Sequence, residues 1–224
     1  MFDAIVLSDL HLGSSLCQAD LLLETLEEMS EKTHLLVLNG DVFDSHDFRR
    51  LCKKQWKVLS KIRKISGDTK VVWVAGNHDG PIDLISQLLG VDAVEEFAFY
   101  SHKAKILATH GDRFDSIMKA SPKLADFGGW LYRQMSHLLP KRMVRAAKYQ
   151  SKIYLRCVDQ VKDGALKEAR ERGFDGVVCG HTHAPESTYT GAQKEWYANS
   201  GSWTDMPCSY LTIRDGSPEL VYVS

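Results

Sequence analysis

The sequence has no excess of charge of either sign. Its 28 basic and 29 acidic residues leave a formal net charge of −1 over 224 residues. A chain that collects nucleic acid or anionic membrane through its overall field needs a strong positive balance, so the whole molecule indicates neither partner. Nucleic acid therefore stays a secondary alternative that would depend on a local basic patch.

Cysteines are few, and their spacing forms no motif. The chain has five, an odd number, and no Cys-x-x-Cys pair. This argues against a disulfide framework and a structural zinc knuckle, and indicates a reducing compartment. The sequence also lacks an N-terminal signal pattern and any apolar run long enough to cross a bilayer. We expect a soluble cytoplasmic protein, with peripheral contact at the inner membrane as the open alternative.

Apolar runs and amphipathic segments alternate along most of the chain. Many of the runs are continuous and β-branched, which is typical of strands buried on both faces. Strands are predicted at 4–7, 35–38, 71–75, 106–109, 176–179, 196–199, 210–213 and 220–223. Helices are predicted at 19–32, 47–66 and 81–89. The pattern predicts one layered α/β domain over residues 1–224, with a more antiparallel C-terminal end.

Residues 116–172 differ from the rest, because they contain no strand-like run and indicate helices broken near Leu139-Pro140. This segment holds 13 Lys and Arg against 5 acids, a balance of +8, so the remainder carries −9. The segment is either a helical cap that recognises anions above an acidic core, or a solvated basic face. A continuous helix from Lys141 would bring Arg145, Lys148 and Lys152 to one side. Trp130 and its apolar neighbours would meet acyl chains or a membrane surface, or form the segment's own core.

Polar clusters follow five of the predicted strands. Side chains at the ends of strands in a rigid sheet can converge on one point, and such positions commonly carry function. The clusters are Ser8-Asp9-Leu10-His11, Asn39-Gly40-Asp41, Gly76-Asn77-His78-Asp79, Thr109-His110-Gly111-Asp112 and Gly180-His181-Thr182-His183. If the chain is extended there, Asp9 and His11 project to the same side, as do His181 and His183. Single histidines are more often ordinary core or surface residues, but five clusters together indicate a site.

The residue types in these clusters are those that bind divalent transition metals. Carboxylates, imidazoles and an amide oxygen suit Mn, Fe, Zn or Co better than a calcium cage. The candidate ligands are Asp9, His11, Asp41, Asn77, His110, His181 and His183. Seven ligands are too many for one ion but suit two ions with a bridging carboxylate, an arrangement that serves phosphoryl displacement. The other histidines, His34, His46, His102 and His137, have no such setting.

This series of motifs resembles the signature of the calcineurin-like metallophosphoesterases along nearly the whole chain. The resemblance implies a four-layer αββα sandwich with a helical cap insertion at about 116–172. It implies two divalent ions, most often manganese. One ion would be held by Asp9, His11 and His183, the other by Asn77, His110 and His181, and Asp41 would bridge them. It also implies that His78 stabilises or protonates the leaving oxygen and that Asp79 orients His78.

Within that superfamily the chain is most similar to the bacterial UDP-2,3-diacylglucosamine pyrophosphatases of lipid A synthesis. The similarity lies in residues 8–12, 39–44, 110–112 and 197–203 and in the helical insertion. It implies cleavage of a lipid-linked nucleotide to UMP and a lipid monophosphate, with acyl chains under the cap. Substrate contacts are then expected from Asp112, Arg145, Lys148, Lys152 and Trp130, and Asp115 is expected to support the His110 segment or to contact a sugar.

Two positions depart from the best-known members of that group. His78 stands where they have Arg, and Ser202 stands where they commonly have Asp. The first departure is shared with a second branch of the group and with generic phosphodiesterases. The alternative function is therefore a generic phosphodiesterase, phosphatase or nuclease of the same superfamily. A non-enzymatic scaffold is disfavoured, because every ligand position and the His78 donor are present.

Overall fold

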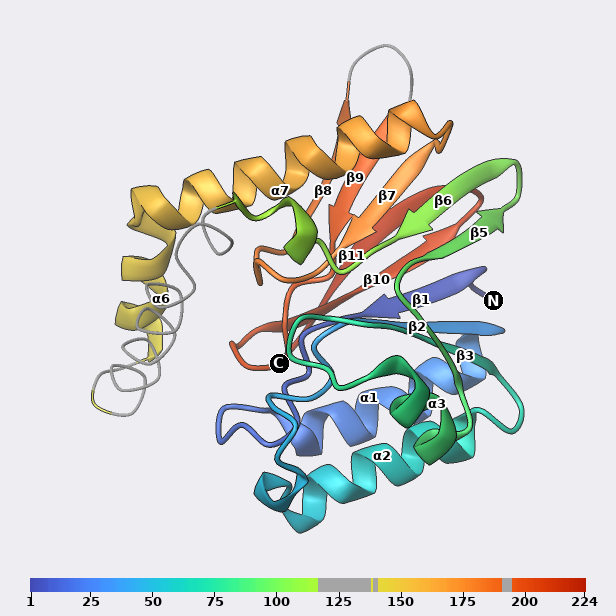
Figure 1. Ribbon diagram of the computed structural model, residues 1–224, viewed down its shortest axis with the longest axis vertical. Coiled ribbons are helices and arrows are strands. Elements are labelled where there is room, and N and C mark those ends of the chain that lie inside the picture. Colours follow the sequence, from blue (N-terminus) through green and yellow to red (C-terminus); the bar gives the residue numbers. More distant parts are fainter. Residues whose placement is uncertain (117–137, 139–140, 191–194) are drawn as a thin grey trace.

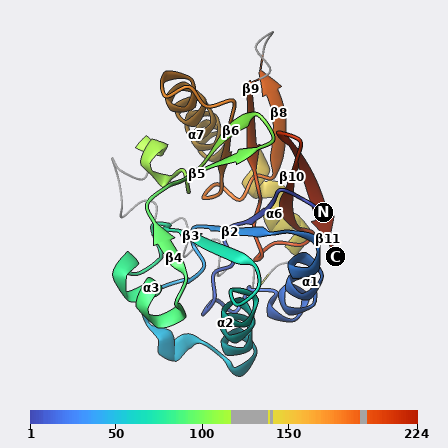
Figure 2. The ribbon, with the colours of Figure 1, turned by 90° about the vertical axis from the view of Figure 1, so that its right-hand side faces the viewer.

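The apolar runs that predicted buried strands form the centre of two sheets (Figure 1). The structure, a computed structural model, describes residues 1–116, 138, 141–190 and 195–224. The first sheet has the strand order β11-β10-β1-β2-β3-β4 and the second β5-β6-β7-β9-β8. Helices α1, α2 and α3 lie outside the first sheet, and α7 lies along the second (Figure 2). The predicted α/β sandwich of two sheets flanked by helices is confirmed.

The bounds of the elements follow the sequence pattern closely. The first sheet contains β1 (Ala4–Leu7), β2 (Leu35–Asn39), β3 (Lys70–Val74), β4 (Asp92–Val94), β10 (Cys208–Arg214) and β11 (Ser217–Val223). The second contains β5 (Phe97–Ser101), β6 (Ala104–Ala108), β7 (Gly176–Cys179), β8 (Glu186–Thr190) and β9 (Glu195–Asn199). The helices are α1 (Ala19–Lys32), α2 (Lys53–Ile65), α3 (Ile82–Leu89), α6 (Lys141–Gln150) and α7 (Lys152–Glu171), with single 3-10 turns η1 (Phe48–Arg50) and η2 (Asp112–Phe114).

The central strands are parallel, which brings their carboxyl ends to one edge of each sheet. In the first sheet β1 pairs with β2, β2 with β3 and β3 with β4 in parallel. In the second, β6 pairs with β7 and β7 with β9 in parallel. The C-terminal strands β10 and β11 are antiparallel, as predicted. The polar clusters follow the parallel strands β1, β2, β3, β6 and β7, at the edge where open α/β sheets carry their sites.

Alternate side chains of these strands enter two different cores. Val6, Val37 and Val178 pack between the sheets. Their neighbours Ile5 and Leu7 pack under the helices of the first layer. Because both faces of the sheet are covered, the strands are apolar at every position rather than at every second one.

The second half of α7 forms the outer layer over the second sheet. Ala165 and Ala169 belong to the same buried cluster as Val177 and Cys179 of β7. The first half of α7 and the whole of α6 extend beyond the sheet (Figure 1). Among the described residues, no helix is long and apolar enough to span a bilayer.

Two predicted helices are interrupted. The segment predicted as one helix at 47–66 is η1 followed by α2, because Leu51 is extended and the Cys52 N–H donates to the Gln55 side chain at the start of α2, at 2.9 Å. The continuous helix drawn from Lys141 is wrong as well. It breaks at Ser151, whose Oγ accepts a hydrogen bond from Tyr154 N and caps α7.

Candidate functional site

The loops after β1 and β2 run side by side through backbone hydrogen bonds. Asp9 N donates to Gly40 O at 2.9 Å, and His11 N donates to Asp41 O at 3.0 Å. The loops of the second sheet are joined in the same way, since Gly180 N donates to His110 O at 2.9 Å. The two sets meet where His181 N donates to Asp9 Oδ2 at 3.0 Å. Clusters that are far apart in the sequence thus share one site.

Most of the candidate ligands have left-handed backbone. The φ angles of Asp9, His11, Asp41, His181 and His183 are 54°, 46°, 51°, 63° and 54°. The prediction that extended backbone sends both members of each Asp-x-His or His-x-His pair to one side is therefore wrong in its geometry. Non-glycine residues seldom adopt this region, at a cost of about 1–3 kcal/mol each, and such strain clusters at functional sites. The turns aim these side chains where a regular strand would not.

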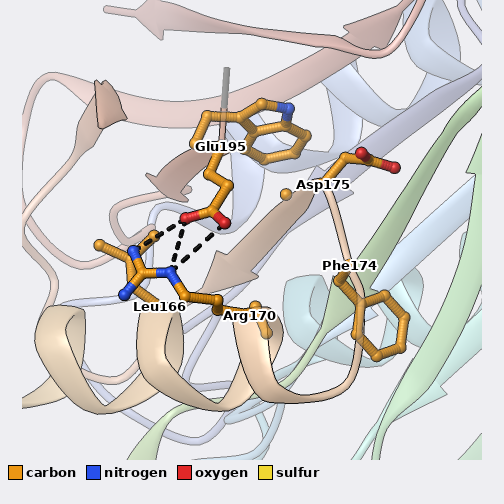
Figure 3. A pocket seen from close by; sticks show the side chains of 8 residues that line it. Leu166, Arg170, Phe174, Asp175 and Glu195 are labelled. Atoms are coloured by element: carbon orange, nitrogen blue, oxygen red, sulfur yellow. Dashed lines mark hydrogen bonds and ion pairs between the residues drawn. The ribbon is translucent and has the colours of Figure 1, made fainter. Parts of the chain in front are cut away.

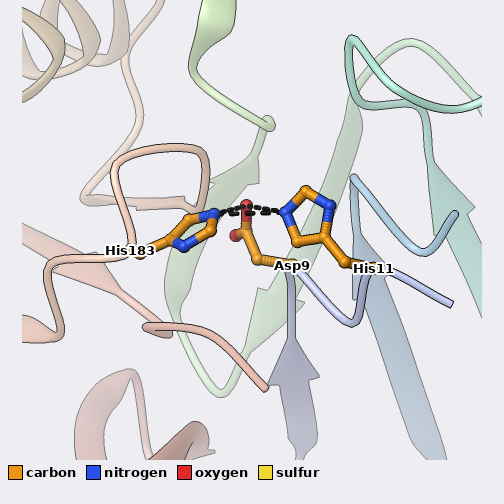
Figure 4. A group of neighbouring side chains, drawn as sticks. All are labelled: Asp9, His11 and His183. Atoms are coloured by element: carbon orange, nitrogen blue, oxygen red, sulfur yellow. Dashed lines mark hydrogen bonds and ion pairs between the residues drawn. The ribbon is translucent and has the colours of Figure 1, made fainter. Parts of the chain in front are cut away.

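Asp9, His11 and His183 form the first group of candidate ligands (Figure 4). Asp9 Oδ1 lies 3.1 Å from His183 Nε2 and 3.8 Å from His11 Nε2. The two imidazole Nε2 atoms are 3.2 Å apart. One carboxylate oxygen and two ring nitrogens thus point to a common space, as Figure 4 shows. This is the set predicted for one of the two ions.

Asp41 lies between the first group and His110. Asp41 Oδ2 is 3.9 Å from His11 Nε2 and 3.3 Å from His110 Nε2. On the other side of its ring, His110 Nδ1 lies 3.0 Å from the carbonyl of Asn39. A ring that donates Nδ1–H to that carbonyl turns Nε2 toward Asp41, where Nε2 carries a lone pair once the ring is neutral. Gly40 permits this contact, because a Cβ at Gly40 would lie 2.2 Å from His110 Nδ1.

Asn77 and His181 face each other at the more exposed side of the site. His181 Nδ1 is 3.1 Å from Asn77 Oδ1. The rings of His181 and His110 lie edge to face, with centroids 5.4 Å apart. The three side chains predicted for the second ion are therefore neighbours.

The charges and bonding of these groups fit divalent cations. Burial opposes ionisation of Asp9 and Asp41, but neighbouring imidazoles outweigh it: His183 lowers the pKa of Asp9, and His110 lowers the pKa of Asp41. Burial likewise opposes charging of His110, yet Asp41 raises its pKa to about 10, so a cation must displace that proton. Within the described residues, Asp9 Oδ1 and His110 Nε2 are buried and make no well-aligned hydrogen bond, despite the ion-pair contacts at 3.1 Å to His183 and 3.3 Å to Asp41. A cation between the groups would satisfy both atoms.

His78 is half-buried beside Asp41. Its backbone N–H donates to Asp41 Oδ1 at 2.9 Å, and its Nε2 lies 4.0 Å from Asp41 Oδ2. The resemblance assigned the orientation of His78 to Asp79, but the group 3.0 Å from His78 Nδ1 is the carbonyl of Asp44. Asp79 instead accepts hydrogen bonds from Phe43 N, Trp73 Nε1 and Gly76 N. The buried Asp79 carboxylate therefore holds the turn that carries His78.

The residues predicted to contact substrate lie in η2 and in the insertion that follows it. Asp112 is half-buried in η2, and Lys152 is exposed at the start of α7. Lys148 Nζ lies 3.7 Å from Asp205 and over the ring of Tyr154. Arg145 belongs to α6, but its side chain is not among those described, and Trp130 lies outside the described residues. The roles of these five residues in substrate binding therefore stay predictions.

Three contacts to the His181 to His183 segment were not predicted, two from the insertion and one from Asp115 just before it. Tyr154 Oη donates to Thr182 O at 3.1 Å, and Tyr149 Oη donates to His183 O at 3.4 Å. Asp115 Oδ2 accepts from His181 Nε2 at 3.0 Å. Asp115 had been given a supporting role near His110, but no sequence signal links it to His181. The two tyrosines had no signal beyond an aromatic residue on a predicted helix.

Asp44 is another residue for which the sequence pattern indicates no role. Its Oδ1 lies 3.5 Å from His11 Nδ1, its Oδ2 lies 2.6 Å from Arg50, and its carbonyl meets His78. His46 had been treated as ordinary, yet its Nε2 is 3.0 Å from the carbonyl of Asp79. Both residues support the loops after β2 and β3. Their place in the run after Asp41 was the only signal.

Two hollows outside the histidine cluster contain ion pairs. In the first, between α7 and β9, Arg170 faces Glu195 at 2.8 Å (Figure 3). The second is a cleft of about 430 Å³ beside the loop after His11. Its cations Arg50 and Lys54 each pair with an aspartate, at 2.6 and 2.5 Å. Neither hollow offers an unbalanced charge for a phosphate.

Comparison with known proteins gives one family and one fold. The model of the calcineurin-like phosphoesterase family matches residues 3–185. No curated protein matches the chain. Among solved structures, Yfce, a phosphoesterase from E. coli, is 19% identical and covers 99% of each chain with a TM-score of 0.54. An archaeal phosphodiesterase is 12% identical over 98% of this chain and 99% of its own, with a TM-score of 0.56. Vps29 from Chaetomium thermophilum is 13% identical over 100% and 99%, with a TM-score of 0.54. At these identities the likeness shows the fold alone.

Proposed function

Because this chain belongs to the calcineurin-like phosphoesterase family and is a metal-dependent hydrolase, we propose that it cleaves a phosphoanhydride or phosphodiester at a two-metal centre. The proposed substrate is a lipid-linked nucleotide of the UDP-2,3-diacylglucosamine class, which would yield UMP and a lipid monophosphate. Such a substrate has a charged diphosphate at the scissile bond and an apolar tail beside it. The chain must therefore offer both a metal site and an apolar surface.

The ligand roles in this proposal follow the two groups of the site. Asp9, His11 and His183 would hold one ion, and Asp41 would bridge to the other. The second would be held by Asn77, His110 and His181. Two divalent ions bound there, with manganese proposed and Fe, Zn or Co also suited to the donors, would supply hydroxide near neutral pH and neutralise charge on the phosphate oxygens.

His78 would deliver a proton to the leaving oxygen. Its Nδ1 is held by the carbonyl of Asp44 at 3.0 Å, which leaves Nε2 as the donor when the ring is protonated. Asp79 would be a positioning residue that does not contact the His78 ring, since it accepts a hydrogen bond from the backbone of the turn before His78. The Asp41 carboxylate also fixes the backbone N–H of His78, so the donor and the proposed bridge are held together.

The observation that carries the choice of substrate is the contact of the insertion with the His181 to His183 segment, here called the metal loop. Tyr149 of α6 and Tyr154 of α7 donate to the backbone of the His181 to His183 segment. The same helices expose the large apolar side chains Met143, Ile153 and Leu155. Exposed large apolar side chains on helices that also carry exposed basic residues favour acyl chains or a lipid surface as the partner.

The test compares a lipid nucleotide with a small ester. We expect manganese-loaded protein to release UMP from UDP-2,3-diacylglucosamine much faster than it cleaves an aryl phosphodiester. Release of UMP is measured by phosphorus NMR. Replacing Met143, Ile153 and Leu155 together by Ser should raise KM for the lipid nucleotide at least tenfold and leave the aryl ester unchanged. The matched control replaces Leu84 and Leu88, exposed on α3. Aryl-ester cleavage without UMP release would reject this substrate and keep the metal centre.

A generic phosphodiesterase is the second candidate. The side chain of His78 is 39% exposed, so its ring is accessible to a substrate without a lipid tail. The neighbours named as a phosphoesterase and a phosphodiesterase share this fold. Equal loss of lipid-nucleotide and aryl-ester hydrolysis in the Asp41→Ala variant is expected for both candidates. Only the substrate comparison separates them.

A further inference from the structure

Asp115 links the insertion to a candidate metal ligand. Its Oδ2 accepts hydrogen bonds from His181 Nε2 and from Cys157 Sγ, each at 3.0 Å. The Asp115 side chain is 3% exposed and that of His181 is 6% exposed. A carboxylate this deeply buried is costly unless hydrogen-bond donors surround it. Two donors converge on the same oxygen.

The hydrogen bond to Asp115 determines which nitrogen of His181 is available to a cation. If Nε2–H donates to Asp115, then Nδ1 carries the lone pair. Nδ1 lies 3.1 Å from Asn77 Oδ1, which is itself a lone-pair acceptor. Two acceptors aimed at one another repel unless a cation or a proton lies between them. The arrangement is that of a metal-binding histidine whose second nitrogen is held by a carboxylate.

The three residues are held in register by close packing of α7 on η2. Asp115 directly follows η2, and Cys157 lies on α7. Where the two elements meet, a Cβ added to Gly164 of α7 would lie 2.8 Å from the ring of Phe114 in η2. No larger residue would permit this approach without a shift. The position of Cys157 relative to Asp115 is therefore fixed by the fold.

We propose that Asp115 is a positioning residue for the second metal ion, and that Cys157 ties it to α7. Through Asp115 the insertion would set the ring orientation and tautomer of His181, in addition to the backbone contacts made by Tyr149 and Tyr154. The inference rests on the proposed metal centre. Asp115, Cys157 and His181 are also close enough to hold an ion of their own. The contacts of 3.0 Å from one oxygen to both donors fit hydrogen bonds better than ligands around a shared ion.

The test measures binding of the two ions separately. Manganese is titrated calorimetrically into metal-free wild type, Asp115→Asn and Cys157→Ala, with the coupled Mn pair followed by electron paramagnetic resonance. We expect Asp115→Asn to lower the affinity for the second ion about 10- to 100-fold. The affinity for the first ion should not change, and the coupled signal should be lost at limiting metal. Cys157→Ala should lower the affinity for the second ion by a smaller factor. Cys157→Ser should keep the wild-type affinity, because a hydroxyl group also donates a hydrogen bond to Asp115.

The controls separate positioning from folding. Asp159→Asn changes an exposed carboxylate on the same helix and should bind both ions as wild type does. If Asp115 has a purely structural role, Asp115→Asn should lower the melting temperature of the metal-free protein and the affinity for both ions alike. That result would overturn the proposal. Two ions bound with unchanged affinities in Asp115→Asn would overturn it while leaving the proposed function intact. Three ions in wild type, one lost in Cys157→Ala, would replace it by a third metal site. Wild type that binds no divalent ion would reject the proposed function as well.

Discussion

Replacing Gly180 by Ala tests whether the metal loops are as closely packed as the structure shows. A Cβ at Gly180 would lie 2.5 Å from Asp9 Oδ2 and from Ser8 Oγ, whereas ordinary contacts begin at 3.4 Å. The loop would have to move by about 0.9 Å. His181 N, which donates to Asp9 Oδ2 at 3.0 Å, would then lose that bond.

The cost of this shift combines overpacking and the lost bond. Overpacking costs about 1–3 kcal/mol, and a hydrogen bond to a charged group is worth about 1.5–3 kcal/mol. Because one movement causes both, we expect a total of about 3 kcal/mol and, for a chain of this size, a fall in melting temperature of about 6–12 °C. Manganese binding should weaken as well, because Asp9 and His181 would no longer be held together.

Gly80 supplies the matched control for this measurement. It also lies beside a ligand motif, but the nearest atom to an added Cβ is 4.0 Å away and its φ is not left-handed. We expect Gly80→Ala to melt and bind manganese as wild type does. The two variants are compared by calorimetric melting with and without metal. If Gly180→Ala melted at the same temperature as Gly80→Ala and bound manganese with wild-type affinity, the steric argument would be refuted.

Three further outcomes follow from the structure. Chelation should abolish hydrolysis, and manganese at a hundredfold excess over its Kd should restore it and add about 3 kcal/mol to the free energy of unfolding, measured by denaturant titration. His78→Ala should slow esters with poor leaving groups about 10²- to 10⁴-fold and nitrophenyl esters far less, in steady-state assays; an equal loss would argue against proton donation. The Arg172 and Arg113 guanidiniums lower the pKa of Glu96 to about 2, so its ion pairs stabilise the fold above the unfolded pKa and lose this effect as the pH falls from about 5 to about 2. Glu96→Gln should cost about 1–2 kcal/mol at pH 7, after allowance for solvent screening, and nothing near pH 2.

The central strands and the ligand types could be predicted because both depend on local sequence. The bounds of β1 and β7 agree with the apolar runs at 4–7 and 176–179, since strands buried on both faces need apolar side chains at every position. The strands β4, β5 and β8 were missed. Each lies at the edge of its sheet, and β8 alternates half-buried and exposed residues, mostly polar, in a pattern typical of a loop.

The geometry of the site could not be predicted, because it depends on contacts between distant segments. Asp115 and His181 are 66 residues apart, and Cys157 and Asp115 are 42 apart. The left-handed φ of Asp9 and His11 contradicts the extended backbone that their spacing suggested. Neighbouring loops impose that conformation through hydrogen bonds to the backbone of residues 40 and 41. The sequence motifs indicate which residues are candidate ligands, whereas the hydrogen bonds between the loops determine the orientation of their side chains.

Helix α7 explains how an insertion can act on a metal site without disturbing the sheets. Its 20 residues span about 30 Å. The C-terminal half is fixed to the second sheet by buried Ala165 and Ala169, and Arg172 beyond its end pairs with Glu96. The N-terminal half, which carries Tyr154 and Cys157, is therefore held over the metal loop by a helix anchored at its other end. We expect changes to its exposed face to leave the candidate ligands in place, because Tyr154 and Cys157 make their contacts from the half-buried side.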